Sequence, residues 1–284
     1  MVCGMSAQEL DAFLLRELRA DAPYGDKTTE AVGLSGEARA VFLAKQDLVV
    51  AGLPASLRTF ELADAACSWA ALSEEGARVS KGTVIAKTYG PVPALLLAER
   101  TALNLLQRLC GIATASARAV AAVEGTSARV LDTRKTTPGL RNLEKYAVRM
   151  GGGYNHRMGL SDGILLKDNH VAAAGSVAAA VVAARNRAGA LWKVEVEVMD
   201  LGMYREALSA GAEVILLDNM SDADMAQAVL ERPAGVLLEA SGGMTLERLR
   251  VVAELGVDFI SMGALTHSAP AADISMELVQ PGRD

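Results

Sequence analysis

The sequence predicts an α/β protein in which a small α+β domain is followed by a barrel of about six parallel strands. Before about Arg100, short β-branched runs are separated by glycine-bearing turns. After Arg100, strand, loop and helix follow one another repeatedly, which is typical of parallel strands closed or nearly closed into an α/β barrel. A chain of 284 residues, 51% of them hydrophobic, is long enough for one large domain and a smaller one.

The first domain is expected to open with a helix near Ala7–Leu18. Candidate strands follow at Ala40–Leu43, Leu48–Val50 and Thr83–Ala86. Leucines at helical spacing then predict a long helix over about Glu99–Glu124. We place the domain boundary in this stretch, which gives an N-terminal domain of residues 1–108 and a barrel of residues 109–284, with the last residues free to pack back on the first domain.

Six short apolar runs then alternate with amphipathic helical stretches. The candidate barrel strands are Arg129–Leu131, Gly163–Leu166, Val194–Val198, Val214–Leu217, Val236–Leu238 and Phe259–Ser261. In α/β barrels, polar residues just past the C-terminal ends of the strands build the active site. Polar residues or glycines stand at these ends in all six runs: Asp132, Arg134 and Lys135, then Lys167, Glu197, Asp218, Ser241–Gly243, and finally Gly263 and Ala264.

Composition narrows the possible partners. The net charge is -6 and the chain has no basic run, which argues against nucleic acid as a partner. No secretory signal or membrane-spanning run is found, so we expect a cytoplasmic protein. The three cysteines, Cys3, Cys67 and Cys110, are widely spaced and odd in number, which suits reduced thiols.

Cationic side chains nevertheless gather in one short part of this acidic chain. They are Arg134, Lys135, His156, Arg157 and Lys167. Arginine grips a planar carboxylate through two hydrogen bonds, and lysine adds further positive charge. The cluster therefore predicts a site for a small, highly charged anion that bears carboxylates or phosphates.

Loops after the last two strands predict phosphate binding. In Ser241–Gly243 the absent side chains let backbone N–H groups reach a phosphate at a helix start, and Gly263–Ser268 supplies a second such loop. Glu195 and Glu197 alternate with valines and therefore share one face of their strand. Buried carboxylates need cations, so Lys167, Arg134 and a substrate-borne divalent ion are their expected partners.

Several motifs together resemble those of the quinolinate phosphoribosyltransferases, a type II phosphoribosyltransferase family. The similarity runs from about Asp21 to Leu278 and rests on Ala22–Thr29, Glu99–Asn104, Asp132–Gly139, Gly151–Arg157, Lys167–His170, Glu195–Val198, Leu217–Asn219, Glu239–Gly243 and Gly263–Ser268. The resemblance implies an N-terminal α/β sandwich, an open α/β barrel and a homodimer, while a higher oligomer stays open. It also implies that Arg100 enters the active site of the partner subunit.

The resemblance assigns roles to the polar residues. Quinolinate would be bound by Arg100, Thr133, Arg134, Lys135, His156, Arg157 and Lys167. Lys135, Glu197 and Asp218 would act in catalysis, the last two beside the Mg²⁺ carried by phosphoribosyl diphosphate, and no ion is expected to be held by the protein alone. The phosphates would be bound by Ser241, Gly242, Gly243, Gly263, Ala264 and His267.

The implied enzyme is a pentosyltransferase of de novo NAD biosynthesis. It would convert quinolinate and 5-phosphoribosyl 1-diphosphate to nicotinate mononucleotide, diphosphate and CO2. Three alternatives remain at this point: a related protein of molybdenum-transport operons, a Schiff-base lyase that uses Lys167 or Lys135 as nucleophile, and a dimeric ligand-binding protein without catalysis. The intact Lys167–His170 and Asp132–Lys135 favour the quinolinate enzyme over the first of these.

Overall fold

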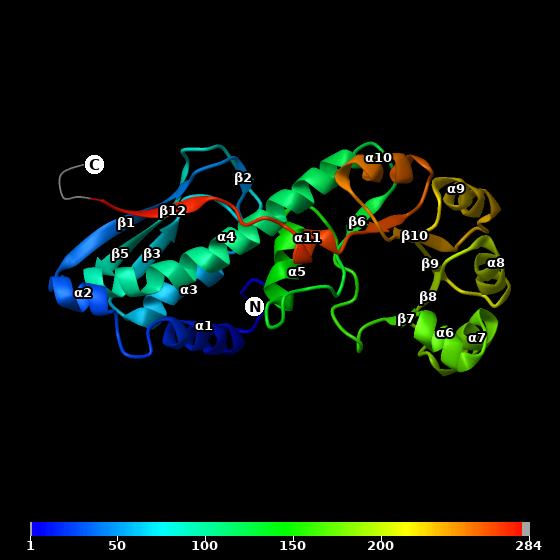
Figure 1. Cartoon of the computed structure of the whole chain (residues 1–284), viewed down its shortest axis with the longest axis horizontal. Coiled ribbons are helices and arrows are strands. Elements are labelled where there is room, and N and C mark those ends of the chain that lie inside the picture. Colours follow the sequence, from blue (N-terminus) through cyan, green and yellow to red (C-terminus); the bar gives the residue numbers. More distant parts are fainter. Residues whose placement is uncertain (1, 280–284) are drawn as a thin grey trace. The chain divides into compact units, whose positions relative to one another are not determined.

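The computed structural model describes residues 2–279 and confirms the mixed α/β fold (Figure 1). The chain forms two compact units. The first contains the residues up to Ala117, Thr137–Gly152 and those from Ser268 onward, and the second contains Arg118–Thr136 and Gly153–His267. Residues 280–284, which fall in the predicted barrel domain 109–284, lie outside the described residues.

The first unit is built on a four-stranded antiparallel sheet with strand order β12-β1-β5-β3. Its elements are α1 (Ala7–Asp21), α2 (Lys27–Val32), β1 (Glu37–Ala44), β2 (Leu48–Val49), α3 (Leu53–Ala63), β3 (Ser68–Ala71), β4 (Arg78–Val79), β5 (Val84–Pro91), α5 (Arg141–Met150) and β12 (Ile274–Val279). Alternate residues of β1 are buried, so one face of the sheet covers the core. There Phe42 meets Phe60 of α3 edge to face, with ring centroids 5.8 Å apart.

One long helix, α4 (Val92–Ala122), follows β5 directly. It begins at Val92, earlier than the predicted Glu99. Pro93 can lie in its first turn, because the missing N–H of a proline costs no helical hydrogen bond there. The predicted boundary between residues 108 and 109 falls inside this helix. Among the described residues, no helix is both long and apolar enough to cross a membrane.

The second unit holds a six-stranded parallel sheet with strand order β6-β11-β10-β9-β8-β7. Its elements are β6 (Arg129–Leu131), β7 (Ile164–Leu166), α6 (Asp168–Ala174), α7 (Val177–Arg187), β8 (Val194–Val198), α8 (Leu201–Ser209), β9 (Val214–Asp218), α9 (Asp222–Glu231), β10 (Leu237–Ser241), α10 (Leu246–Glu254), β11 (Phe259–Ser261) and α11 (Ala264–His267). All six predicted strands are present. Because β6 and β7 are the two edge strands, the barrel is open, as expected.

The strands of this sheet are apolar until their C-terminal ends. In β9 the first four residues are buried, and Asp218 at the end is half-buried. The helices that follow begin with side-chain caps: Ser221 accepts the N–H of Asp224 for α9, and Thr245 accepts the N–H of Arg248 for α10. Strand ends and capped helix starts thus bring polar groups to one edge of the sheet.

Candidate active site

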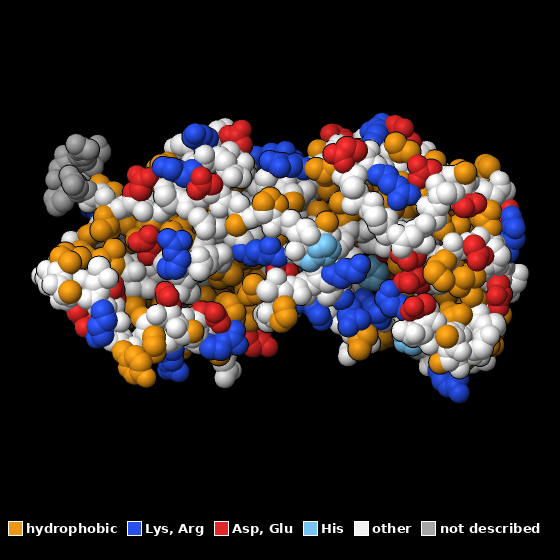
Figure 2. All heavy atoms as spheres, in the orientation of Figure 1, with side chains coloured by type: hydrophobic (Ala, Val, Ile, Leu, Met, Phe, Trp, Pro, Cys, Tyr) orange, Lys and Arg blue, Asp and Glu red, His pale blue; other side chains and the backbone are white. Residues whose placement is uncertain are grey.

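A cavity of about 390 Å³ lies at the C-terminal ends of the parallel strands, within the second unit. Its lining residues are Thr133, Arg134, Lys135, His156, Arg157, Leu165, Lys167, Glu197, Leu216, Asp218, Asn219, Glu239, Ser241, Gly242, Gly243 and Ser261. In the right-hand half of Figure 2, Lys and Arg side chains gather next to Asp and Glu side chains. Cationic and anionic side chains therefore line the same cavity.

Two arginines give the cavity buried donors. The Nε atoms of Arg134 and Arg157 are buried and have no hydrogen-bond partner among the described residues. A guanidinium Nη1 of Arg157 donates to the Gly163 carbonyl at 3.1 Å. Burial, followed by the nearby charge of Arg134, lowers the pKa of Arg157 below its ordinary value. Two like charges held this close, with donors left over, suit an anion with at least two charges.

A buried carboxylate shapes the loop that carries His156 and Arg157. Asp132, which is fully buried, accepts the side-chain amide of Asn155 at 2.5 Å and the backbone N–H of His156 at 2.9 Å. The backbone N–H of Asp132 donates to the Tyr154 carbonyl, and the Tyr154 N–H donates to Val130. The loop is thereby fixed to the end of β6.

We expect Asp132→Ala to destabilise the protein by about 2–4 kcal/mol, because it removes a fully buried carboxylate that accepts hydrogen bonds from Asn155 and His156. Denaturant unfolding measures the free energy. The matched control is Asp222→Ala, which breaks an ion pair between exposed Asp222 and Arg248 and should cost under about 1 kcal/mol. Equal losses in the two variants would contradict the role given to Asp132.

Two carboxylates stand on neighbouring strands of the cavity. Glu197 on β8 accepts a hydrogen bond from the Lys167 ammonium at the end of β7, and Asp218 on β9 accepts the Asn219 side-chain amide at 2.9 Å. Both carboxylates line the cavity and are half-buried. Carboxylate oxygens are the ligands that Mg²⁺ prefers, so this pair fits a magnesium ion carried by a phosphorylated substrate.

The loop after β10 requires its glycines. Gly242 has a φ of +87°, and a Cβ placed there would lie 2.2 Å from the Asn219 Oδ1 atom. Gly243 also has a positive φ, +57°, and Thr245 caps the helix α10 that follows. Backbone N–H groups at such a turn before a helix start favour a phosphate.

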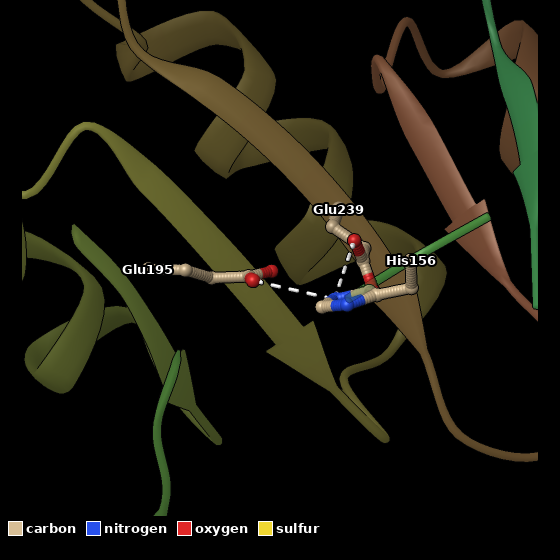
Figure 3. A group of neighbouring side chains, drawn as sticks. All are labelled: His156, Glu195 and Glu239. Carbon is tan, nitrogen blue, oxygen red and sulfur yellow. Dashed lines mark ion pairs between the residues drawn. The ribbon is translucent and has the colours of Figure 1, made fainter. Parts of the chain in front are cut away.

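His156 lies between two buried carboxylates, as Figure 3 shows. Its Nε2 atom is 3.3 Å from an oxygen of Glu195 on β8 and 3.6 Å from an oxygen of Glu239 on β10. Its Nδ1 atom accepts the backbone N–H of Arg157 at 2.7 Å. Burial, and then the charge of Glu195, raise the pKa of Glu239 to about 8.

This cluster of one histidine and two glutamates does not fit a metal ion, although donor atoms of all three residues lie within 4.8 Å of one another. A histidine that binds a metal uses one ring nitrogen as the ligand and keeps a proton on the other. Nδ1 of His156 accepts an N–H and so carries no proton. The remaining proton must then lie on Nε2, the atom that faces the carboxylates.

The cavity brings together most of the residues predicted from the sequence. Thr133, Arg134, Lys135, His156, Arg157, Lys167, Glu197, Asp218 and Ser241–Gly243 all line it. Gly263, Ala264 and His267 are not among its lining residues. Gly263 nevertheless adjoins the site, because a Cβ there would lie 2.9 Å from the Lys135 side chain. Arg100 is exposed on α4 and belongs to the first unit.

The sequence reasoning gave no site role to Glu239, Asn219 or Ser261, which also line the cavity. Glu239 could have been found from strand periodicity, because it lies two residues before Ser241 and so faces the same side of β10. Asn219 has a φ of +53°, an unusual value for a residue with a side chain, and nothing in the sequence pattern signals that conformation.

Comparison with known protein families agrees with this geometry. The model of the quinolinate phosphoribosyl transferase C-terminal domain matches residues 112–277, and that of the N-terminal domain matches residues 26–110. The chain belongs to the quinolinate phosphoribosyltransferase family. These two matches extend from Asp26 to Glu277 and include both units.

Individual relatives of the family are similar over nearly their whole length. The nicotinate-nucleotide pyrophosphorylase (carboxylating) of Mycobacterium leprae is 43% identical over 270 residues, which cover 93% of this chain and 95% of the relative. The human protein of the same name is 41% identical over 266 residues, covering 92% and 89%. The crystal structure of NadC from Streptococcus pyogenes superposes with a TM-score of 0.91 at 42% identity and covers 97% of this chain and 98% of that chain.

Proposed function

We propose that this protein converts quinolinate and 5-phosphoribosyl 1-diphosphate to nicotinate mononucleotide, diphosphate and CO2. The observation that supports this best is the composition of the cavity in the second unit. Two arginines with unused buried donors lie in it, together with two carboxylates and a glycine turn. A dianionic pyridine and a phosphorylated sugar have the charges and shapes that such a cavity would select.

Quinolinate would occupy the cationic part of the cavity. Its two carboxylates need several N–H donors in fixed positions, and Arg134, Arg157 and Lys167 offer them. Glu197 already accepts a hydrogen bond from Lys167, so the lysine ammonium is held in place before the substrate arrives. Such positioning lowers the entropic cost of bringing the pyridine nitrogen to the sugar.

Phosphoribosyl diphosphate would occupy the opposite part. Its phosphates would be bound by backbone N–H groups of Ser241–Gly243, and Glu197 with Asp218 would hold the Mg²⁺ that it carries. When bound, that ion neutralises charge on the diphosphate leaving group. The Lys135 ammonium supplies further positive charge at the same edge.

The reaction we propose needs no protein nucleophile. The pyridine nitrogen attacks the anomeric carbon, and the bond from that carbon to the diphosphate oxygen breaks. Carboxylates of Glu197 and Asp218 stabilise positive charge that develops on the ribose ring. The quaternised nitrogen then withdraws electrons from the adjacent ring carbon, whose bond to the carboxylate breaks to release CO2. A proton from solvent completes the product.

A product assay by mass with quinolinate and nicotinate in competition tests the function. We expect nicotinate mononucleotide from quinolinate only, with release of diphosphate and CO2 that requires Mg²⁺. Turnover of nicotinate with no use of quinolinate would overturn the proposal. Binding of both substrates without any product would instead indicate a ligand-binding protein.

Schiff-base chemistry is less consistent with this cavity. That mechanism needs a lysine amine that is free to attack a carbonyl group, whereas the Lys167 Nζ atom is held by a hydrogen bond to Glu197. Trapping with borohydride and a carbonyl substrate should therefore leave the protein unmodified. A covalent adduct on Lys167 or Lys135 would support the lyase.

We further propose that the enzyme acts as a homodimer, with Arg100 of each subunit completing the cavity of its partner. The exposed position of Arg100 on α4 is compatible with this role.

The reducing conditions of the cytoplasm would suit the three cysteines, which are buried and free.

Mixing two inactive variants tests the shared site. We expect Arg100→Ala and Lys167→Ala each to abolish activity, and an equal mixture after subunit exchange to recover about a quarter of wild-type activity. Half of the dimers would be mixed, and one of the two sites in each mixed dimer would carry neither lesion. No recovery despite exchange shown by differently tagged subunits would argue against a shared site.

A further inference from the structure

Two buried acids, Glu195 and Glu239, lie close together next to the cationic residues of the cavity. The exposed fractions of the two residues are 8% and 2%, and one carboxyl oxygen of each is buried without a hydrogen-bond partner among the described residues. Two ionised carboxyls this close repel each other, and burial removes the water that would screen them. At least one neutralising proton or cation is therefore required.

His156 cannot supply that charge while its present hydrogen bonds last. An imidazolium carries protons on both ring nitrogens, but Nδ1 of His156 accepts the N–H of Arg157 at 2.7 Å. The ring is therefore neutral, with its proton on Nε2, where it can be donated to the carboxylates. The compensating proton must then sit on the acid pair.

Of the two acids, Glu239 is the better place for this proton. The groups that face it are Glu195 from β8, His156 from the loop after Tyr154, and Ser261 from β11. Glu195 also interacts with the positive charge of Arg157. Burial, and then the charge of Glu195, raise the pKa of Glu239, and this direction agrees with the assignment.

We propose that Glu239 acts as a positioning residue: it stays protonated, hydrogen-bonds Glu195, and so holds His156 as the neutral Nε2–H tautomer whose Nδ1 orients Arg157. The imidazole of His156 contacts Glu195 on β8 and Glu239 on β10 (Figure 3). On its other side, Nδ1 accepts the backbone N–H of Arg157. Glu239 touches no reacting atom in this scheme. It determines how many negative charges lie under the quinolinate carboxylates.

The charge state of Glu239 should therefore control affinity for quinolinate, an inference that rests on the proposed function. Ionisation of Glu239 places a second negative charge beside His156 and Glu195. That charge competes with the substrate dianion for Arg157 and disturbs the imidazole whose Nδ1 accepts the Arg157 N–H. Quinolinate binding should weaken as the pH rises through about 8, whereas binding of phosphoribosyl diphosphate, which would lie on the opposite side of the cavity, should not follow this titration.

The first experiment examines the histidine without any substrate. Two-bond ¹H–¹⁵N correlations on protein with ¹⁵N-labelled histidine distinguish the two tautomers and the imidazolium, and His170→Asn and His267→Asn identify the His156 signal. We expect protonated Nε2 and unprotonated Nδ1 at pH 7. An imidazolium, or a proton on Nδ1, would overturn the proposal whether or not the protein proves to be the enzyme.

The second experiment measures steady-state kinetics between pH 7 and pH 9. If only protein with protonated Glu239 binds quinolinate, the KM for quinolinate should rise about tenfold over this range, given a pKa of about 8. In Glu239→Gln, which stays neutral, the rise should fall below about twofold. The KM for phosphoribosyl diphosphate serves as the internal reference.

Glu213→Gln is the matched control, because Glu213 also lies next to β8 but accepts the N–H of Val194 at its other end. It should keep the wild-type rise in KM. The same rise in Glu239→Gln as in the wild type would refute the positioning role. If the expected tautomer is found but no turnover of quinolinate is detected, the proposed function fails and the proton arrangement stands.

Discussion

Arg134→Ala is expected to raise the KM for quinolinate by roughly a hundredfold to a thousandfold with a smaller change in kcat. The side chain lines the cavity, and its buried Nε has no partner among the described residues, so its donors are available to a substrate carboxylate. Removing one partner of a buried charge pair costs about 2–5 kcal/mol, and the expected loss of affinity, about 2.7–4.1 kcal/mol, lies within that range. Steady-state kinetics with quinolinate varied at saturating phosphoribosyl diphosphate measures the effect.

Two controls separate binding from folding. Arg134→Lys keeps the charge but loses the two-pronged geometry, so it should recover only part of the affinity. Arg205→Ala removes an arginine that pairs with Glu231 on the outer helices, and its KM for quinolinate should be unchanged. An unchanged KM in a folded Arg134→Ala variant would show that quinolinate is bound elsewhere.

Gly242→Ala is expected to raise the KM for phosphoribosyl diphosphate by about ten- to a hundredfold. The added methyl group would lie 2.2 Å from the Asn219 side chain, and the φ of +87° disfavours any residue with a Cβ. The loop must shift, and its N–H groups then lose their alignment with a phosphate. Titration of this substrate at saturating quinolinate measures the change.

Gly235→Ala is the matched control for that loop. Gly235 also has a positive φ, +92°, but no atom lies within 4 Å of the position its Cβ would take. The two variants should lose similar stability from the backbone, about 1 kcal/mol, while only Gly242→Ala should lose affinity for the phosphorylated substrate. Equal KM values in both variants would exclude phosphate binding by this loop.

The fold was largely predictable because its local signals agree with its tertiary structure. The six barrel strands are short apolar runs that end in polar residues, and all six appear where expected. The start of α4 was missed because β5 runs directly into the helix, so that no loop separates Pro91 from Val92.

The location of the candidate site could be predicted where the type of a residue indicates the chemistry that it performs. The cationic residues and glycines near the strand ends predicted a binding site there. Eleven of the predicted residues line the cavity, counting Ser241–Gly243 as three. The contact between His156 and Glu239 could not be predicted, because it joins residues 83 positions apart through a loop whose path depends on Asp132. Whether a buried acid keeps its proton likewise depends on neighbours that only the folded chain supplies.

The antiparallel pairing of β12 with β1 has a consequence for biosynthesis. Residues 39–44 find their partners at residues 274–279, so one edge of β1 is paired only by a strand that is translated after the whole second unit. A nascent chain on the ribosome would expose the hydrogen-bonding edge of β1 until β12 has emerged, and an exposed strand edge can pair with other chains. Cells that make this protein quickly would therefore depend on chaperones to shield that edge.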